Sequence, residues 1–148
     1  MNIKFFIWLF SVVCLIEVFA PSSVAAQSPD DILIVANKDV SNDTISKDEL
    51  VSIFLKQRTA WKDGLRAVPL HAGKSELRSK FLRLLLGLSA LEEKTYWQEQ
   101  KITKGISPPP EFNNQLKAVF KLKGAISYIY RSEYKENVVK ILMVVPQL

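Results

Sequence analysis

The stretch AVPLHAGKSELRSKF, residues 67–81, decides the fold class of this chain. It begins as a short apolar strand over 67–71, passes through a small loop, and continues as a helix that Ser75 can cap. Pro69 has no backbone donor and therefore favours the edge of a sheet. A strand that leads directly into a helix is typical of α/β domains.

The segments around this stretch continue the alternation of strands and helices. Residues 32–36 are an unbroken apolar run rich in branched side chains, which predicts a strand covered on both faces. Two capping boxes predict the starts of further helices: Ser46 with Glu49, and Ser89 with Glu92. We expect the first of these helices to end near Gln57, and the second to end before Gly105.

The remaining elements follow from apolar spacing and from glycine. The helix after Ser75 should bury one stripe and end at Gly87 in a left-handed cap, the stripe being Leu77, Phe81, Leu84, Leu85 and Leu88. Residues 107–110 are too rich in proline for a helix, and a fourth helix over 112–122 should point Leu116, Val119 and Phe120 inward before Gly124 ends it. Strands over 125–130 and 138–145 complete an α/β domain whose helices cover a mixed, mostly parallel sheet.

The first 26 residues have the pattern of an export signal. Lys4 precedes an apolar run over 5–19, and Val24-Ala25-Ala26 supplies small side chains, so we expect cleavage after Ala26. The alternative is a membrane anchor, but a spanning helix needs roughly 20 apolar residues, and this shorter run contains Glu17. The residues before Cys14 lack the spacing of a lipid-attachment site.

Removal of residues 1–26 would leave residues 27–148 as one domain outside the cytoplasm, in the periplasm or secreted. The formal charge of the chain is +5. A basic protein attracts anionic partners, but the lysines are scattered and an exported protein seldom meets nucleic acid, so we expect no nucleic-acid partner.

Catalytic chemistry has few candidate residues here. His71 is the only histidine, and Cys14, the only cysteine, lies in the leader, so cysteine–histidine pairs and histidine-rich metal sites are excluded. The sequence also has no Gly-x-Ser-x-Gly elbow. We therefore expect no enzyme activity, no metal site and no cofactor.

The loop over 71–75 is the candidate ligand site, because anions gather where a strand of an α/β sheet ends and a helix begins. His71 could donate a hydrogen bond, Lys74 could supply a charge and Ser75 a hydroxyl, and Gly73 belongs to the same candidate site. In the alternative interpretation Ser75 only caps the helix, and Glu76 already neutralises the helix dipole.

Several motifs in one order resemble the phosphate ABC-transporter substrate-binding family. They cover nearly all of residues 32–142: IFLKQ (53–57), WKDG (61–64), VPLH (68–71) with Ser75, Arg78 and Phe81, YW (96–97) with Gly105 and Pro108, and GAISY (124–128). The resemblance implies one lobe of a type 2 periplasmic-binding-protein fold and recognition of phosphate or a similar oxyanion. It also implies that Ser75 matches the family's serine, while His71 stands where the family has arginine.

Two functions fit the sequence. The first is an exported phosphate or oxyanion substrate-binding-like protein related to transporter receptors, with its ligand at residues 71–75. The second is a non-enzymatic periplasmic interaction module, which keeps the fold, has lost the ligand and contacts a membrane or envelope protein.

Overall fold

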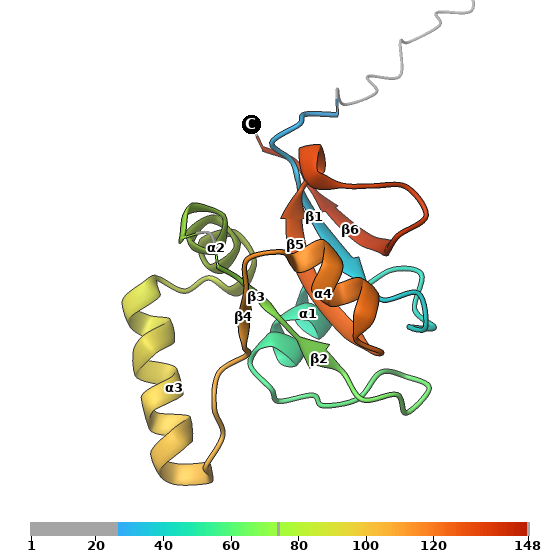
Figure 1. Ribbon diagram of the computed structural model, residues 1–148. Helices are drawn as coiled ribbons and strands as arrows, with labels where there is room; N and C mark the ends of the chain where they lie inside the picture. The colour runs from blue at the N-terminus through green and yellow to red at the C-terminus, as the bar shows by residue number, and fades with distance from the viewer. Residues whose placement is uncertain (1–26, 74, 148) are drawn as a thin grey trace, which may run out of the picture.

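The computed structural model describes residues 27–73 and 75–147, and of Ser75 only the backbone. The elements follow one another in this order: β1 (Ile32–Ala36), α1 (Lys47–Phe54), β2 (Val68–Pro69), β3 (His71–Ala72), α2 (Ser75–Phe81), the π-helical turn η1 (Leu82–Leu86), α3 (Ala90–Lys104), β4 (Glu111–Phe112), α4 (Gln115–Lys121), β5 (Ala125–Tyr130), the 3-10 turn η2 (Arg131–Glu133) and β6 (Lys140–Val145). Figure 1 shows a sheet with helices on its two sides, which confirms the predicted α/β class.

The main sheet is mixed, with strand order β2-β5-β1-β6. Strands β2, β5 and β6 run in one direction, as a mostly parallel sheet requires, but β1 runs the opposite way between β5 and β6. Two of its three ladders are therefore antiparallel, which corrects the expected pairing. The reason is topological: the segment over 131–139 carries the chain from one side of β1 to the other, so β5 and β6 flank β1 instead of pairing.

Strand β1 is buried on both faces, as predicted. Ile32 and Ile34 belong to the core cluster that includes side chains of α1 and α2. Leu33 and Val35 point the other way, into a cluster with Val119 of α4. Because successive side chains of a strand alternate between faces, this apolar run contributes to two cores at once.

The predicted strand over 67–71 is divided between two sheets. Val68 and Pro69 form β2 at the edge of the main sheet, where the proline's missing donor does no harm. After Leu70, residues His71 and Ala72 form β3, which pairs in parallel with β4 in a separate small sheet. The sequence analysis missed β4, and its formation delays the fourth helix from 112 to Gln115.

Both predicted capping boxes are present, at the starts of α1 and α3. Gly87 adopts the predicted left-handed conformation at a helix end, and Gly105 adopts the same conformation where α3 ends, with φ of 68° in each case. Helix α1 ends at Phe54, earlier than expected, and β6 begins at Lys140. These shifts at element ends leave the architecture unchanged.

Two apolar side chains predicted to point inward are exposed. The π-helical turn η1 adds a residue to one turn of the helix, so that Leu82 and Leu85 are buried and Leu84 faces solvent. Phe120 is 57% exposed because α4 packs through Ala118 and Val119. The side chain of Asn37, at the end of β1, fixes this orientation by donating to the carbonyls of residues 119 and 120.

Helix α3 stands out from the body of the molecule (Figure 1). Of its 15 residues, only Glu93 and Trp97 are buried. It contacts the rest of the structure mainly through these two side chains and through Tyr96, whose hydroxyl donates to the carbonyl of Leu55 at 2.9 Å. The described part of the chain contains no helix long and apolar enough to cross a membrane.

Candidate functional site

The loop over 71–75 lies where β3 ends and α2 begins, beside β4. The backbone of Gly73 donates to the carbonyl of Phe112 at 2.9 Å, which holds the loop against β4. A Cβ at Gly73 would lie 2.4 Å from Oδ1 of Asn113, an exposed side chain that can turn aside, and 3.3 Å from the carbonyl oxygen of Phe112, so the loop passes close to β4. Lys74 and the side chain of Ser75 lie outside the described part of the structure.

His71 is almost completely buried, at 1% exposure, instead of reaching into the loop. Its Nδ1 lies 3.0 Å from the hydroxyl of Tyr128, and its Nε2 lies 3.1 Å from Oε1 of Glu93. The rings of Phe54 and Phe81 enclose it, with centroids at 5.4 and 6.2 Å. Both ring nitrogens of His71 are therefore engaged by protein groups.

The hydrogen bonds around His71 fit one neutral tautomer. The carboxylate of Glu93 can only accept, so the proton of the ring belongs on Nε2. Nδ1 then accepts from the hydroxyl of Tyr128, and the oxygen of that hydroxyl accepts from the backbone N–H of Ala72 at 3.2 Å. Each donor in these three hydrogen bonds has an acceptor, so His71, Glu93 and Tyr128 form a satisfied buried network.

Burial sets the titration of this cluster. It lowers the pKa of His71, and nearby Arg78 lowers it further, although the hydrogen bond with Glu93 acts in the opposite direction. Burial alone would raise the pKa of Glu93, but hydrogen bonds from His71 and Arg78 outweigh it, and that pKa is lowered. Burial also raises the pKa of Tyr128. Near neutral pH, His71 is thus uncharged and Glu93 is ionised.

Arg78 is the cation closest to this cluster, and two carboxylates already bind it. Its Nη2 donates to both oxygens of Glu93, at 3.1 and 3.0 Å, and its Nη1 pairs with Glu111 of β4. Glu93 thus joins α3 to β3 and α2 at once. Sequence reasoning missed Glu93 and Glu111, although the spacing of Glu93 and Trp97 by four residues was a signal that both share one face of a helix.

Of the four predicted ligand residues, the structure describes the surroundings of His71 and Gly73, and these two differ. His71 lies in the interior and serves the packing of β3 against α3, whereas Gly73 is exposed at the loop. Two exposed acidic side chains belong to the neighbouring elements: Glu76 lies in the first turn of α2, and Glu111 of β4 stands opposite His71 and pairs with Arg78. The described residues contain no group of three or more His, Cys, Asp or Glu side chains that could hold a metal ion.

Three solved structures share the fold of this chain. An ABC-type phosphate transport receptor from Vibrio cholerae aligns with a TM-score of 0.59 and 18% identity, over 78% of this chain and 47% of the receptor. A putative phosphate ABC transporter substrate-binding protein with bound phosphate from Clostridium perfringens gives 0.58 and 20%, over 76% and 44%. PstS from Borrelia burgdorferi gives 0.57 and 16%, over 76% and 46%.

These matches confirm that the resemblance seen in the sequence extends to the fold. The chain spans less than half the length of each of the three proteins, as a single lobe of a larger receptor does. No protein-family model matches the sequence, and no curated protein matches it.

Proposed function

We propose that this protein is exported and acts outside the cytoplasm as a one-lobe binding protein for phosphate or a similar oxyanion. The observation that carries the proposal is the fold it shares with phosphate transport receptors, one of them solved with bound phosphate. The net charge of +5 favours an anionic ligand. The protein works by binding, since the sequence offers no catalytic set.

The proposed contact is the loop over 71–75, through Gly73, Lys74 and Ser75. Two side chains that could strengthen binding already have partners inside the protein. His71 is neutral and hydrogen-bonded to Tyr128 and Glu93, and Arg78 is paired with two carboxylates. A single lobe also leaves the anion partly in water, where each contact is weak. We therefore expect a dissociation constant of about 1 mM, far weaker than that of an enclosed site.

Calorimetric titration of inorganic phosphate into the secreted protein tests this proposal. Lys74→Ala should weaken binding several-fold, and Lys104→Ala, at the far end of α3, should not change it. Glu76→Gln should strengthen binding, because it removes a negative charge from the first turn of α2. Absence of saturable heat at phosphate concentrations well above the expected dissociation constant, in wild type and in Glu76→Gln alike, would rule out the oxyanion site.

A second function, an interaction module without a small ligand, is favoured by the burial of His71. The side chain that stands where the family has arginine packs inside the protein and holds α3 through Glu93. On this hypothesis phosphate gives no heat, and the protein binds a membrane or envelope protein instead. Crosslinking in the intact envelope, followed by mass spectrometry, would identify such a partner.

Export itself rests on the leader, residues 1–26, which lie outside the described residues. Secretion through the leader should release a chain that begins at Gln27. Intact-mass measurement of the secreted protein checks the cleavage position. A full-length mass in the membrane fraction would contradict export as a free protein.

A further inference from the structure

An apolar groove separates helix α3 from the body of the molecule, on a part of the surface that the oxyanion hypothesis does not use. Its cavity volume is about 530 Å³. Its apolar lining comes from three separate segments: Leu82 of η1, Ala90 and Trp97 of α3, and Pro108 of the connector. A cavity of this volume lies within the range of sites for small organic ligands, roughly 300–1,000 Å³.

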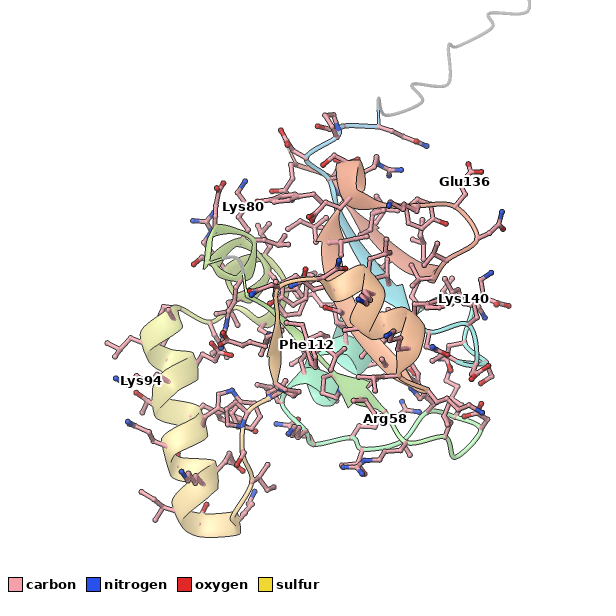
Figure 2. The ribbon with its side chains drawn as sticks, viewed as in Figure 1. Arg58, Lys80, Lys94, Phe112, Glu136 and Lys140 are labelled. Carbon is pink, nitrogen blue, oxygen red and sulfur yellow. The ribbon has the colours of Figure 1, made fainter. Side chains whose placement is uncertain are left out.

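Some charged side chains along the groove form ion pairs, and others do not. Among the lining residues, Arg78 forms an ion pair with Glu93, and it also pairs with Glu111, which lies outside the lining. Lys94 and Lys101 also line it, are exposed, and form no ion pair within residues 27–73 and 75–147. Figure 2 shows Lys94 on α3, at the outer side of the molecule. The unpaired charge of the groove is therefore positive.

Trp97 lines the groove and carries an unsatisfied polar group, which is itself buried. This side chain is buried, at 6% exposure, yet its Nε1–H has no acceptor among the residues described. The indole of Trp61, by contrast, donates to the carbonyl of Gly124 at 2.9 Å. A buried donor without an acceptor is costly, so the Nε1–H of Trp97 is an unfavourable feature of this part of the structure.

We propose that this groove is a binding site for a small amphipathic organic anion. The apolar body of the ligand lies against Leu82, Trp97 and Pro108. Its carboxylate or sulfonate group pairs with Lys94 and Lys101, because these are the cations left unmatched along the lining. The site is separate from the loop over 71–75, so it stands whether or not phosphate binds there.

A matched pair of fluorescent probes tests both halves of the proposal. 8-Anilinonaphthalene-1-sulfonate has an apolar body and an anionic group, and N-phenyl-1-naphthylamine has nearly the same body without the charge. We expect saturable binding of both to the secreted protein, with the sulfonate about tenfold tighter, as two exposed ion pairs would give. Equal affinities would overturn the anionic half, and lack of saturable binding would overturn the site.

Surface variants locate the probe. Ala90→Trp fills the groove from an exposed position and should abolish binding of both probes. Lys94→Glu combined with Lys101→Glu should remove the advantage of the sulfonate and leave the neutral probe unaffected. Lys104→Glu is the control, because it changes the charge of α3 outside the groove lining. Unchanged binding in the first two variants, with a native circular dichroism spectrum, would contradict the proposal.

The indoles of Trp97 and Trp61, both of which remain in the secreted protein, can be compared in one spectrum. In a ¹H–¹⁵N spectrum, the side-chain signal of Trp97, assigned by its loss in Trp97→Phe, should shift on titration with the sulfonate. The signal of Trp61 should stay in place, because its N–H is bonded inside the core. Saturation of the fluorescence with no shift at Trp97 would place the probe elsewhere and overturn the assignment. Displacement of the probe by an acidic peptide, but not by decanoate, would replace the small-ligand proposal with a protein partner.

Discussion

His71 is the only histidine of the chain, and the fold holds it uncharged between Glu93 and Tyr128. Its pKa is lowered on folding, so below about pH 6.5 the unfolded chain takes up a proton that the folded protein does not. Stability must then fall as the pH falls, by up to about 1.4 kcal/mol per pH unit. Urea unfolding at pH 7.5 and 5.5 should give a lower midpoint at the acidic pH.

The variant His71→Gln removes this titration while keeping a neutral donor within reach of Glu93. It should be less stable than the wild type at pH 7.5, but its midpoint should change little between pH 7.5 and 5.5. The lowered pKa of Glu93 acts only at more acidic pH, where protonation of the carboxylate removes its stabilising contribution. An equal pH dependence in both proteins would show that His71 is not the titrating group.

Glycine can be needed for its backbone conformation alone, as at Gly105, or also because a neighbouring atom lies too close for a side chain, as at Gly124. Both have positive φ, 72° and 68°. A Cβ at Gly105 would meet nothing within 4 Å, whereas one at Gly124 would lie 2.0 Å from the carbonyl oxygen of Arg66. Gly105→Ala should therefore cost about 1 kcal/mol, the strain of the left-handed conformation. Gly124→Ala should cost about 3 kcal/mol or more, because the backbone must move. Similar urea midpoints for the two variants would contradict the close contact.

At the scale of elements, the sequence predicted what local chemistry controls and missed what packing decides. The caps at Ser46 and Ser89 depend on residues within one turn, and both are present. The faces of Leu84 and Phe120 depend on a π-helical turn and on how α4 meets the sheet, and both were predicted wrongly. Strand β4 has two residues, too few for any periodicity.

The candidate site follows the same division. Sequence alone selected the loop over 71–75 from its position between a strand and a helix. The surroundings of His71 come from Tyr128, 57 positions away, and from a helix that only the tertiary structure brings near. No local pattern encodes such contacts, so the burial of His71 required the structure.

The two capping boxes should respond differently to the same change. Helix α1 buries Leu50, Ile53 and Phe54 in the core, whereas α3 stands apart and can open alone. Loss of either cap should cost about 1 kcal/mol. Ser89→Ala should therefore speed hydrogen exchange in the first turn of α3 about fivefold, and Ser46→Ala should leave it unchanged. Equal acceleration of α3 in both variants would mean that α3 opens only when the whole protein unfolds.

At the scale of the whole molecule, the first and last segments of the described chain contact each other. The backbone N–H of Gln147 donates to the buried carboxylate of Asp31, and the guanidinium of Arg131 donates to the same side chain. The first and last described segments therefore meet at one end of the sheet (Figure 1). The two cores on either face of β1 give a single lobe the packing that a domain needs.

From the order of strands we predict that the two halves of the chain stay associated when the chain is cut between them. A cut after Gly105 would leave β1, β2 and β3 in one piece and β4, β5 and β6 in the other. In the order β2-β5-β1-β6, every neighbouring pair of strands comes from different pieces, and so does the pair β3 and β4. The ladders and both cores should therefore hold the cut protein together.

A protease recognition sequence inserted after Gly105, in the exposed turn that ends α3, makes this cut in the folded protein. After cleavage, the two pieces should coelute in size-exclusion chromatography at the volume of the uncut insertion variant, which is the control. Their far-ultraviolet circular dichroism spectrum should also match that control. In urea, the cut protein should unfold with a midpoint that rises with its concentration, because unfolding now separates two chains. Pieces that elute apart without denaturant would mean that the interleaved sheet contributes less to stability than the covalent connection through α3.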